Sequence, residues 1–172
     1  MNTHHQIPVS IAALQQLNHN ATSWLGHHKA DHKEIAMGQT FIAPAEGELE
    51  TIEVFSSLVT QPGQVIMTLH SFDPQQQSWG PSLGSDTVTF NETCNGKWIA
   101  FKIKGMHLAK GNSYGFRLQS HDSYVGVGEA AGSAKHPPFA SGKEWKFTNK
   151  DKDNKVVAFS YFSLAFKVGL RA

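Results

Sequence analysis

The chain alternates polar and apolar residues over many short stretches, and this two-residue period limits its fold more than any other feature. The alternation runs through TIEVFSSLV (51–59), VIMTLHSF (65–72), NSYGFRLQS (112–120) and FSYFSLAFKV (159–168). A period of two is typical of strands with one buried face. Turn signals such as Asn95-Gly96 separate the stretches, and no helical pattern intervenes. The pattern therefore predicts an all-β, antiparallel β-sandwich of about eight or nine strands.

Residues 1–36 differ from the rest, because they carry six of the ten histidines. Within them SIAALQQLNHNATSWLG (10–26) suits a short helix, with Ser10 as N-cap and Gly26 at its end. An irregular arm that packs Trp24 and Leu25 onto the main domain is an equal alternative. We therefore expect a His-rich N-terminal arm or short helix over 1–36 and one sandwich domain over 37–172.

Composition excludes several classes of protein. The formal net charge is +1 with acids and bases interspersed, so neither a nucleic-acid-binding stripe nor a polybasic membrane patch is present. No apolar run approaches the roughly 20 residues that span a bilayer. The single cysteine, Cys94, excludes an internal disulfide. We expect no nucleic-acid partner and no membrane span.

The N-terminal stretch MNTHHQIPVSIAALQQL has no Lys or Arg before its weakly apolar part. It does not predict a signal peptide as it stands. The protein is then either cytoplasmic or begins after a removed signal.

Five segments occur in a recognisable order: GQTFIAPAEGELETIEVFSSLV, PGQVIMTLHSF, GKWIAFKIKGMHLAKGNSYGFRLQS, YVGVGEAAGS and YFSLAFKV. Over residues 38–168, about three quarters of the chain, this series resembles the jelly-roll modules of bacterial, Bacteroidetes-type extracellular proteins, which are galactose-binding-like and carbohydrate-binding-module-like. The resemblance implies a jelly-roll topology and a secreted or periplasmic protein. Such modules serve as carbohydrate-binding modules, adhesion domains or spacers, so the fold alone does not give the function.

The resemblance leaves a structural Ca²⁺ open, since modules of this kind often hold one, and implies no other cofactor. Asp151 and Asp153 in DKDN are similar to the start of a calcium loop, but the rest of that signature is missing and an ordinary hairpin loop fits better. His28 and His32 would form half a zinc site on a helix. Solvent-exposed histidines are the better interpretation.

Catalysis has little support in the sequence. Glu129 and Glu144 flank the long stretch VGVGEAAGSAKHPPFASGKEWKF (125–147) and could lie near one another. Paired carboxylates hydrolyse glycosides at a suitable separation, but no sequence spacing indicates one here. Signatures of a serine nucleophile, a phosphate loop and a zinc site are missing. We expect that the protein is not an enzyme.

Carbohydrate binding needs flat aromatic faces and planar polar side chains in a preformed site. Trp79, in the turn-rich DPQQQSWGPSLGS, and Trp145, at the end of the long stretch, are the predicted platforms. Arg117 alternates with Phe116 and Leu118 and is therefore predicted to point outward. There it would grip hydroxyls or pair with an acid.

Asp122, Glu129 and His136 complete the predicted ligand-binding residues, because they lie in or beside the long connection. Long connections in compact domains are often binding loops, and the proline pair 137–138 would stiffen this one. The sequence predicts a non-catalytic module for a carbohydrate or similar polar ligand. The alternative is a structural or protein-interaction sandwich with a protein partner and no small-molecule ligand.

Overall fold

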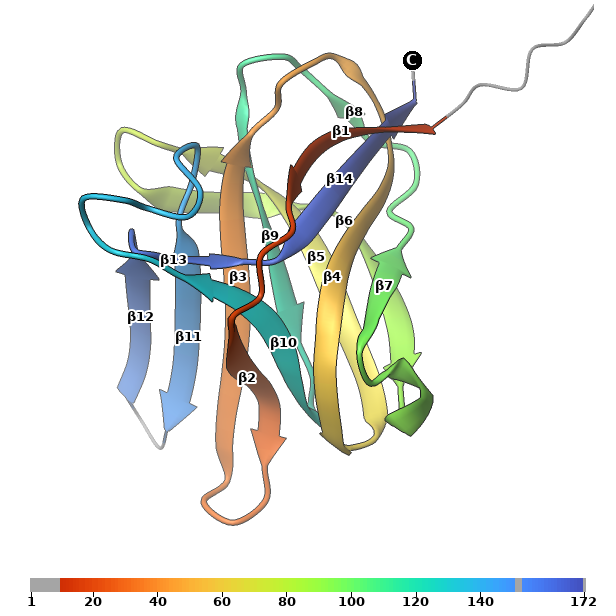
Figure 1. Cartoon of the computed structure of the whole chain (residues 1–172), viewed down its shortest axis with the longest axis vertical. Coiled ribbons are helices and arrows are strands. Elements are labelled where there is room, and N and C mark those ends of the chain that lie inside the picture. Colours follow the sequence, from red (N-terminus) through yellow and green to blue (C-terminus); the bar gives the residue numbers. More distant parts are fainter. Residues whose placement is uncertain (1–9, 151–152, 172) are drawn as a thin grey trace, which may run out of the picture.

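A computed structural model describes residues 10–150 and 153–171 (Figure 1). Within these ranges the secondary structure is fourteen strands and one short 3₁₀ helix, η1 (Glu92–Cys94), with no α-helix. The predicted all-β antiparallel fold is confirmed, although the strands outnumber the eight or nine expected. None of the described segments is a helix that is long and apolar enough to cross a membrane.

One layer of the sandwich is an antiparallel row of strands in the order β12-β11-β3-β9-β5-β6. These strands are β12 (Asp153–Phe159), β11 (Glu144–Lys150), β3 (Lys33–Ile42), β9 (Ser113–Gln119), β5 (Gly63–Asp73) and β6 (Ser78–Phe90). Both edges of this layer are hairpins, since β11 with β12 and β5 with β6 are consecutive in the chain. This layer positions the candidate site.

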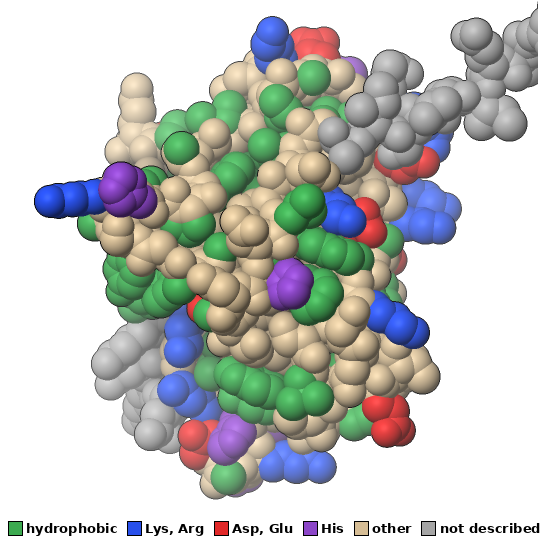
Figure 2. Space-filling model, in the orientation of Figure 1, with side chains coloured by type: hydrophobic (Ala, Val, Ile, Leu, Met, Phe, Trp, Pro, Cys, Tyr) green, Lys and Arg blue, Asp and Glu red, His purple; other side chains and the backbone are tan. Residues whose placement is uncertain are grey.

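The second layer has the order β2-β10-β4-β14-β1, and it faces the viewer in Figure 1. Its strands are β2 (Ala21–His28), β10 (Tyr124–Ala131), β4 (Gly47–Gln61), β14 (Phe166–Arg171) and β1 (Ser10–Gln16). Three short strands extend it: β7 (Lys97–Phe101) and β8 (His107–Leu108) pair with β4, and β13 (Phe162–Leu164) pairs with β10. On the face shown in Figure 2, acidic and basic side chains are scattered among neutral and apolar ones.

From residue 10 onward, the N-terminal segment has neither of the two forms left open by the sequence, because residues 10–16 and 21–28 are strands. Residues 1–9 of the predicted arm lie outside the described residues. Gly26, expected to end a helix, instead joins the two layers. It pairs with Tyr124 of β10 and with Ile35 of β3. Its φ is +117°, and a Cβ there would lie 2.0 Å from the carbonyl oxygen of Ser123. A glycine is therefore required where β2 changes partner, and residue 36 lies inside β3 rather than at a boundary.

The core lies between the layers and follows the predicted alternation. On β5, the side chains of Val65, Met67 and Leu69 are buried, while those between them are half-buried. The opposing layer contributes residues such as Val125 and Phe166. This core is large enough to need neither metal nor disulfide, and Cys94 is a buried free thiol.

Residues 132–143 form the long connection between β10 and β11, as predicted. The chain is tied at its end, because Thr40 and Lys143 exchange hydrogen bonds between Thr40 N and Lys143 O (3.0 Å) and between Lys143 N and Thr40 Oγ1 (2.9 Å). Phe139 packs edge-on against Phe166, with ring centroids 5.2 Å apart. These contacts attach the connection to the sandwich.

Candidate functional site

The site begins with Trp79, which lies on a strand and not in the predicted turn-rich loop. The turn is confined to residues 74–77, where the Asp73 carboxylate accepts hydrogen bonds from the backbone N–H groups of Gln75 (2.9 Å) and Gln76 (3.1 Å). The chain then pairs with β5, and Trp79 lies opposite Phe72. The proline and glycines after Trp79 do not end the strand, because β6 is an edge strand where a missing N–H is tolerated.

Two glycines on adjacent strands make room for the Trp79 ring on the outer face of the first layer. A Cβ on Gly115 of β9 would lie 2.4 Å from Cζ3 of Trp79, and one on Gly38 of β3 would lie 3.0 Å from Cη2. The indole therefore lies against the sheet backbone where side chains would otherwise stand. Trp79 contacts strands that are distant in sequence.

Aromatic rings surround Trp79 and hold its orientation. Phe72, Trp145 and Phe147 contact it edge to face, with centroid separations of 5.7, 5.8 and 5.5 Å. Edge-to-face pairs at these separations are favourable. Trp145 is only 6% exposed. The two predicted tryptophans thus meet in one cluster, in which Trp79 lines the adjacent cleft and Trp145 supports it.

Arg117 points outward from β9, as the alternation predicted. Its guanidinium carbon lies 4.0 Å from the centroid of the Phe147 ring, which is a cation–π contact. The guanidinium of Arg117 makes no hydrogen bond or ion pair with any described residue, and its buried Nε lacks an acceptor among them. Burial lowers the pKa of Arg117 from its ordinary value. The side chain is a half-buried cation without a protein counter-charge in the described part of the chain.

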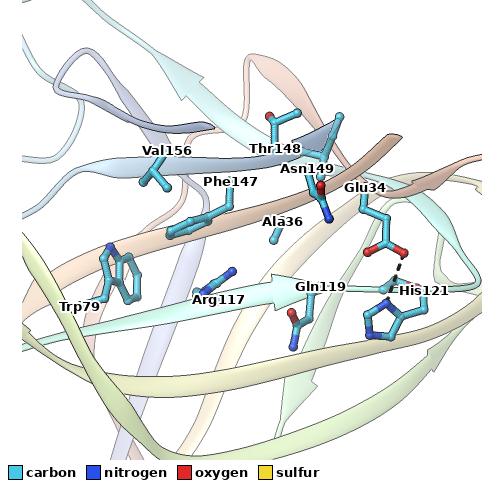
Figure 3. Close-up of a pocket in the computed structure, with 12 residues that line it drawn as sticks. Glu34, Ala36, Trp79, Arg117, Gln119, His121, Phe147, Thr148, Asn149 and Val156 are labelled. Carbon is cyan, nitrogen blue, oxygen red and sulfur yellow. Dashed lines mark hydrogen bonds and ion pairs between the residues drawn. The ribbon is translucent and has the colours of Figure 1, made fainter. Parts of the chain in front are cut away.

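A cleft of about 500 Å³ runs along this outer face from Trp79 to His121 (Figure 3). Trp79, Phe147 and Arg117 form one end, and Glu34 and His121 form the other. The remaining lining residues are Ile35, Ala36, Gln119, Ser120, Thr148, Asn149 and Val156. The cleft therefore has an aromatic end, a polar middle and a Glu–His end.

Glu34 lies between two histidines at its end of the cleft, and it is within hydrogen-bond distance of His121. Its Oε1 lies 3.4 Å from Nδ1 of His121 and 3.6 Å from Nδ1 of His27. Glu34 comes from β3, and His121 follows β9 on the same outward alternation as Arg117 and Gln119. Among the described lining residues, Glu34 is the single acid.

His70 lies beside the aromatic end and is neutral near neutral pH. Its Nδ1 is 3.0 Å from the carbonyl oxygen of Gly80, and its Nε2 is 2.7 Å from the Thr68 hydroxyl. A carbonyl only accepts, so Nδ1 carries the proton and Nε2 accepts from Thr68. Burial lowers the pKa of His70, and the charge of Arg117 lowers it further. The positive charge at this end of the cleft is therefore that of Arg117.

Four predicted ligand-binding residues do not line this cleft: Trp145, which packs behind Trp79, and Asp122, Glu129 and His136. Asp122 holds a turn, because its Oδ1 accepts from the backbone N–H of Gln64 (2.9 Å) and from the Ser120 hydroxyl (3.2 Å). His136 is exposed on the long connection, and Glu129 is buried between the layers. The separation follows from topology, since the long connection leaves β10 in the second layer.

Glu129 and Glu144 are neighbours, as the sequence suggested, but they lie inside the sandwich. They are 8% and 1% exposed, and their carboxyl groups are in hydrogen-bonding contact. Burial raises the pKa of Glu144 to about 10, and the hydrogen bond with Glu129 and its negative charge act in the same direction. Glycosidase carboxyl groups stand about 5 to 9.5 Å apart and face a substrate. This carboxyl pair is too close and too buried for that chemistry.

A metal site has little support in the described residues. No three or more His, Cys, Asp or Glu side chains gather there in a way that would hold an ion. The His28 ring is bound to Asp31 instead, with Nδ1 2.9 Å from Oδ1. Asp151 lies outside the described residues, and the side chain of Asp153 is not described. The calcium prediction stays a prediction.

Several cleft residues were missed by the sequence analysis. Gln119 and His121 continue the outward alternation from Arg117, so the period of β9 was a signal that could have found them. Phe147 and Asn149 relate to Trp145 in the same way on β11. Glu34 carried no such signal, because its strand was not expected to begin at Lys33.

Comparison with known proteins gives no family for the chain. No protein-family model matches it, and no curated protein matches it. Among solved structures it is similar to the cysteine protease and lectin-like domains of Cwp84, a surface-layer-associated protein of Clostridium difficile, with 9% identity and a TM-score of 0.46. The match covers 88% of this chain, which spans 36% of the length of that one. This likeness shows neither a family nor a function.

Proposed function

We propose that the protein is a non-catalytic module that binds a carbohydrate in the cleft between Trp79 and His121. The observation that carries the proposal is one cleft in which an aromatic end adjoins planar polar side chains. Its volume of about 500 Å³ falls within the roughly 300–1,000 Å³ of small-molecule sites. A mono- or disaccharide has matching dimensions.

The chemistry of the lining suits a sugar ring. A pyranose has an apolar face of C–H groups, for which the rings of Trp79 and Phe147 are suitable partners. Its hydroxyls both donate and accept, as do the amides of Gln119 and Asn149. Arg117 adds donors in a fixed planar fork. The glycine platform under Trp79 holds the aromatic end in place before a ligand arrives.

The number and position of carboxyl groups near the cleft support binding without hydrolysis. Glycoside hydrolysis uses two carboxyl groups on either side of the scissile bond. Glu34 is the one acid among the described lining residues, and the carboxyl pair Glu129–Glu144 lies on the other side of the sheet. The described part of the cleft therefore lacks the second carboxyl group that this reaction uses.

Calorimetry against neutral and acidic disaccharides and plant and bacterial polysaccharides tests the proposal. We expect Gln119→Ala to weaken binding about tenfold, because the cleft loses a hydrogen-bonding amide. The matched control is Gln76→Ala, in an exposed turn away from the cleft, and it should leave the affinity unchanged. If no sugar binds at millimolar concentration, or if both variants weaken binding equally, the proposal fails.

A second candidate function, protein interaction, rests on strand β12. Among the described strands, β12 pairs with β11 alone, and it exposes Val156 and Val157 by 56% and 44%. An apolar edge strand is a site for pairing with another chain. Light scattering after size-exclusion chromatography tests whether the chain self-associates through this edge. A dimer that Val157→Lys separates would support this function, and a monomer at all concentrations would contradict self-pairing.

A further inference from the structure

We propose that the sugar bound by this cleft carries a carboxylate, and that the guanidinium of Arg117 binds it. The inference rests on the proposed function and names its class of ligand, a uronic acid or another acidic sugar. It follows from the charge and the geometry of one end of the cleft.

Arg117 lacks a counter-charge in the described structure. It forms no ion pair there, and the acid that shares the cleft, Glu34, lies at the opposite end, where its Oε1 is 3.4 Å from Nδ1 of His121. The positions that flank Arg117 in the sheet are Gly38 on β3 and Thr68 on β5, and neither is charged. A cation removed from water without a partner is unfavourable, so a ligand anion would be stabilised at this point.

Phe147 orients the guanidinium for such a ligand. The ring lies 4.0 Å from the guanidinium carbon and covers one of its faces. Stacking leaves the N–H groups at the edge of the guanidinium plane free to donate. A carboxylate accepts two parallel hydrogen bonds from such an edge, and charge-assisted bonds of this kind are about twice as strong as neutral ones.

The other charges of the cleft place the anion at the Trp79 end. His70 is neutral there, since burial lowers its pKa and its Nε2 accepts a hydrogen bond from the Thr68 hydroxyl. Glu34 marks the opposite end in Figure 3, where its charge would repel a second anion and its oxygens would accept from hydroxyls. The ligand thus has one negative group near Arg117 and hydroxyls toward Glu34.

Matched disaccharides test the inference. Each pair has the same linkage and configuration, gluco, galacto or manno, and differs only at C6, which is CH₂OH in one member and COO⁻ in the other. We expect calorimetry to show about tenfold tighter binding of the oxidised member of at least one pair. Arg117→Gln should remove this preference, while Arg117→Lys should keep part of it because the charge remains. The control is Arg171→Gln. Arg171 lies on β14 and forms an ion pair with Glu50 of β4, so this variant should keep the preference.

Two further ligands test whether the site recognises a carboxylate and whether it requires the sugar that carries it. A 6-O-sulfated disaccharide that binds more tightly than the carboxylate would overturn the assignment to a carboxylate. Acetate that binds as tightly as the oxidised disaccharide would show an anion site that does not recognise a sugar, and would also overturn it.

The inference and the proposed function fail in different ways. Equal affinity for the two members of every matched pair overturns the inference and leaves carbohydrate binding intact. A preference that persists in Arg117→Gln also overturns it. If neither neutral nor acidic sugars bind the folded wild-type protein, both proposals fail together. Thermal unfolding of each variant confirms that losses of binding are not losses of folding.

Discussion

The two faces of strand β11 hold opposite kinds of group, and they reverse the usual arrangement. Outside the sandwich, Trp145 and Phe147 join Trp79 in an apolar cluster. Inside, Glu144 of the same strand lies in contact with Glu129. Amphipathic strands normally bury their apolar face in the core. The reversal is tolerated because the outer rings cover one another, while burial raises the pKa of Glu144 and favours its neutral form.

The two regions should therefore respond to different changes. The outer cluster depends on shape, since its rings fill the space above two glycines. The inner pair depends on protonation, since a neutral carboxyl is what burial allows at that point. Four predictions, from the largest expected effect to the smallest, test this contrast.

Trp145→Ala should lower the free energy of unfolding by about 3 kcal/mol, because it empties a buried ring position in the outer cluster. Denaturation in urea measures the change. Trp145→Phe is the matched control, and it should cost about 1 kcal/mol, since the indole N–H has no partner among the described residues. Equal losses in the two variants would show that ring volume is not what this cluster requires.

Gly115→Ala should lower the free energy of unfolding by about 2 kcal/mol and should also weaken binding in the cleft. The new Cβ would lie 2.4 Å from a Trp79 ring that its neighbours prevent from moving freely. Gly38→Ala should have a smaller effect, because its nearest contact would be 3.0 Å. Tryptophan fluorescence reports displacement of the ring. A stable Gly115→Ala variant with unchanged fluorescence would contradict the platform described for Trp79.

Glu144→Gln should change the pH dependence of stability. The carboxyl has a pKa of 4.5 in the absence of the fold and about 10 within it. Between these values the folded state binds more protons than the unfolded state, so the free energy of unfolding of the wild type should fall as pH rises. We expect a decline of at least about 1–2 kcal/mol between pH 5 and pH 9, and a flatter profile in the variant, which lacks the Glu144 carboxyl.

Chemical denaturation across this pH range measures the decline. Glu92→Gln, in the exposed 3₁₀ helix η1, is the control and should follow the wild type. A wild-type stability that rises with pH over the same range would show that Glu144 is ionised in the folded protein.

Arg117→Gln should change the free energy of unfolding by no more than about 0.5 kcal/mol, the smallest of the four effects. The charge makes no ion pair with a described residue. The variant loses the cation–π contact with Phe147, and it also loses the unfavourable free energy of burying a cation, so the two effects oppose each other. A loss above about 2 kcal/mol would show that Arg117 serves the fold instead of a ligand.

The sequence predicted side-chain positions best where they depend on neighbouring residues in the chain. Alternation on β9 placed Arg117 outside from the apolar residues beside it, and the flanks of the long connection placed Glu129 near Glu144. Trp79 was assigned to a loop because Gly80 and Pro81 follow it, and proline is compatible with an edge strand that only the topology identifies. Gly26 suited the end of a helix, yet its role depends on Ser123, which is distant in the sequence.

The cleft itself could not be predicted, because its parts come from five strands. Gly38 and Gly115 form a platform for Trp79 only when β3 and β9 are paired and β6 places Trp79 over them. Glu34 joins the cleft through His121, a contact over 87 positions in the chain. Residue spacing along one strand carries no information on which strands become neighbours.

The pairing of β1 with β14 has a mechanical consequence. The two strands are antiparallel, and Ser10 lies opposite Arg171 at one end of their ladder. The hydrogen bonds of such a ladder run across the strands. A pulling force applied through these two residues would load the hydrogen bonds one after another, beginning at the Ser10–Arg171 pair. The sandwich should therefore open at low force, beginning with the separation of β1 from β14. The cleft strands β3, β9 and β11 would stay paired until these two strands had separated.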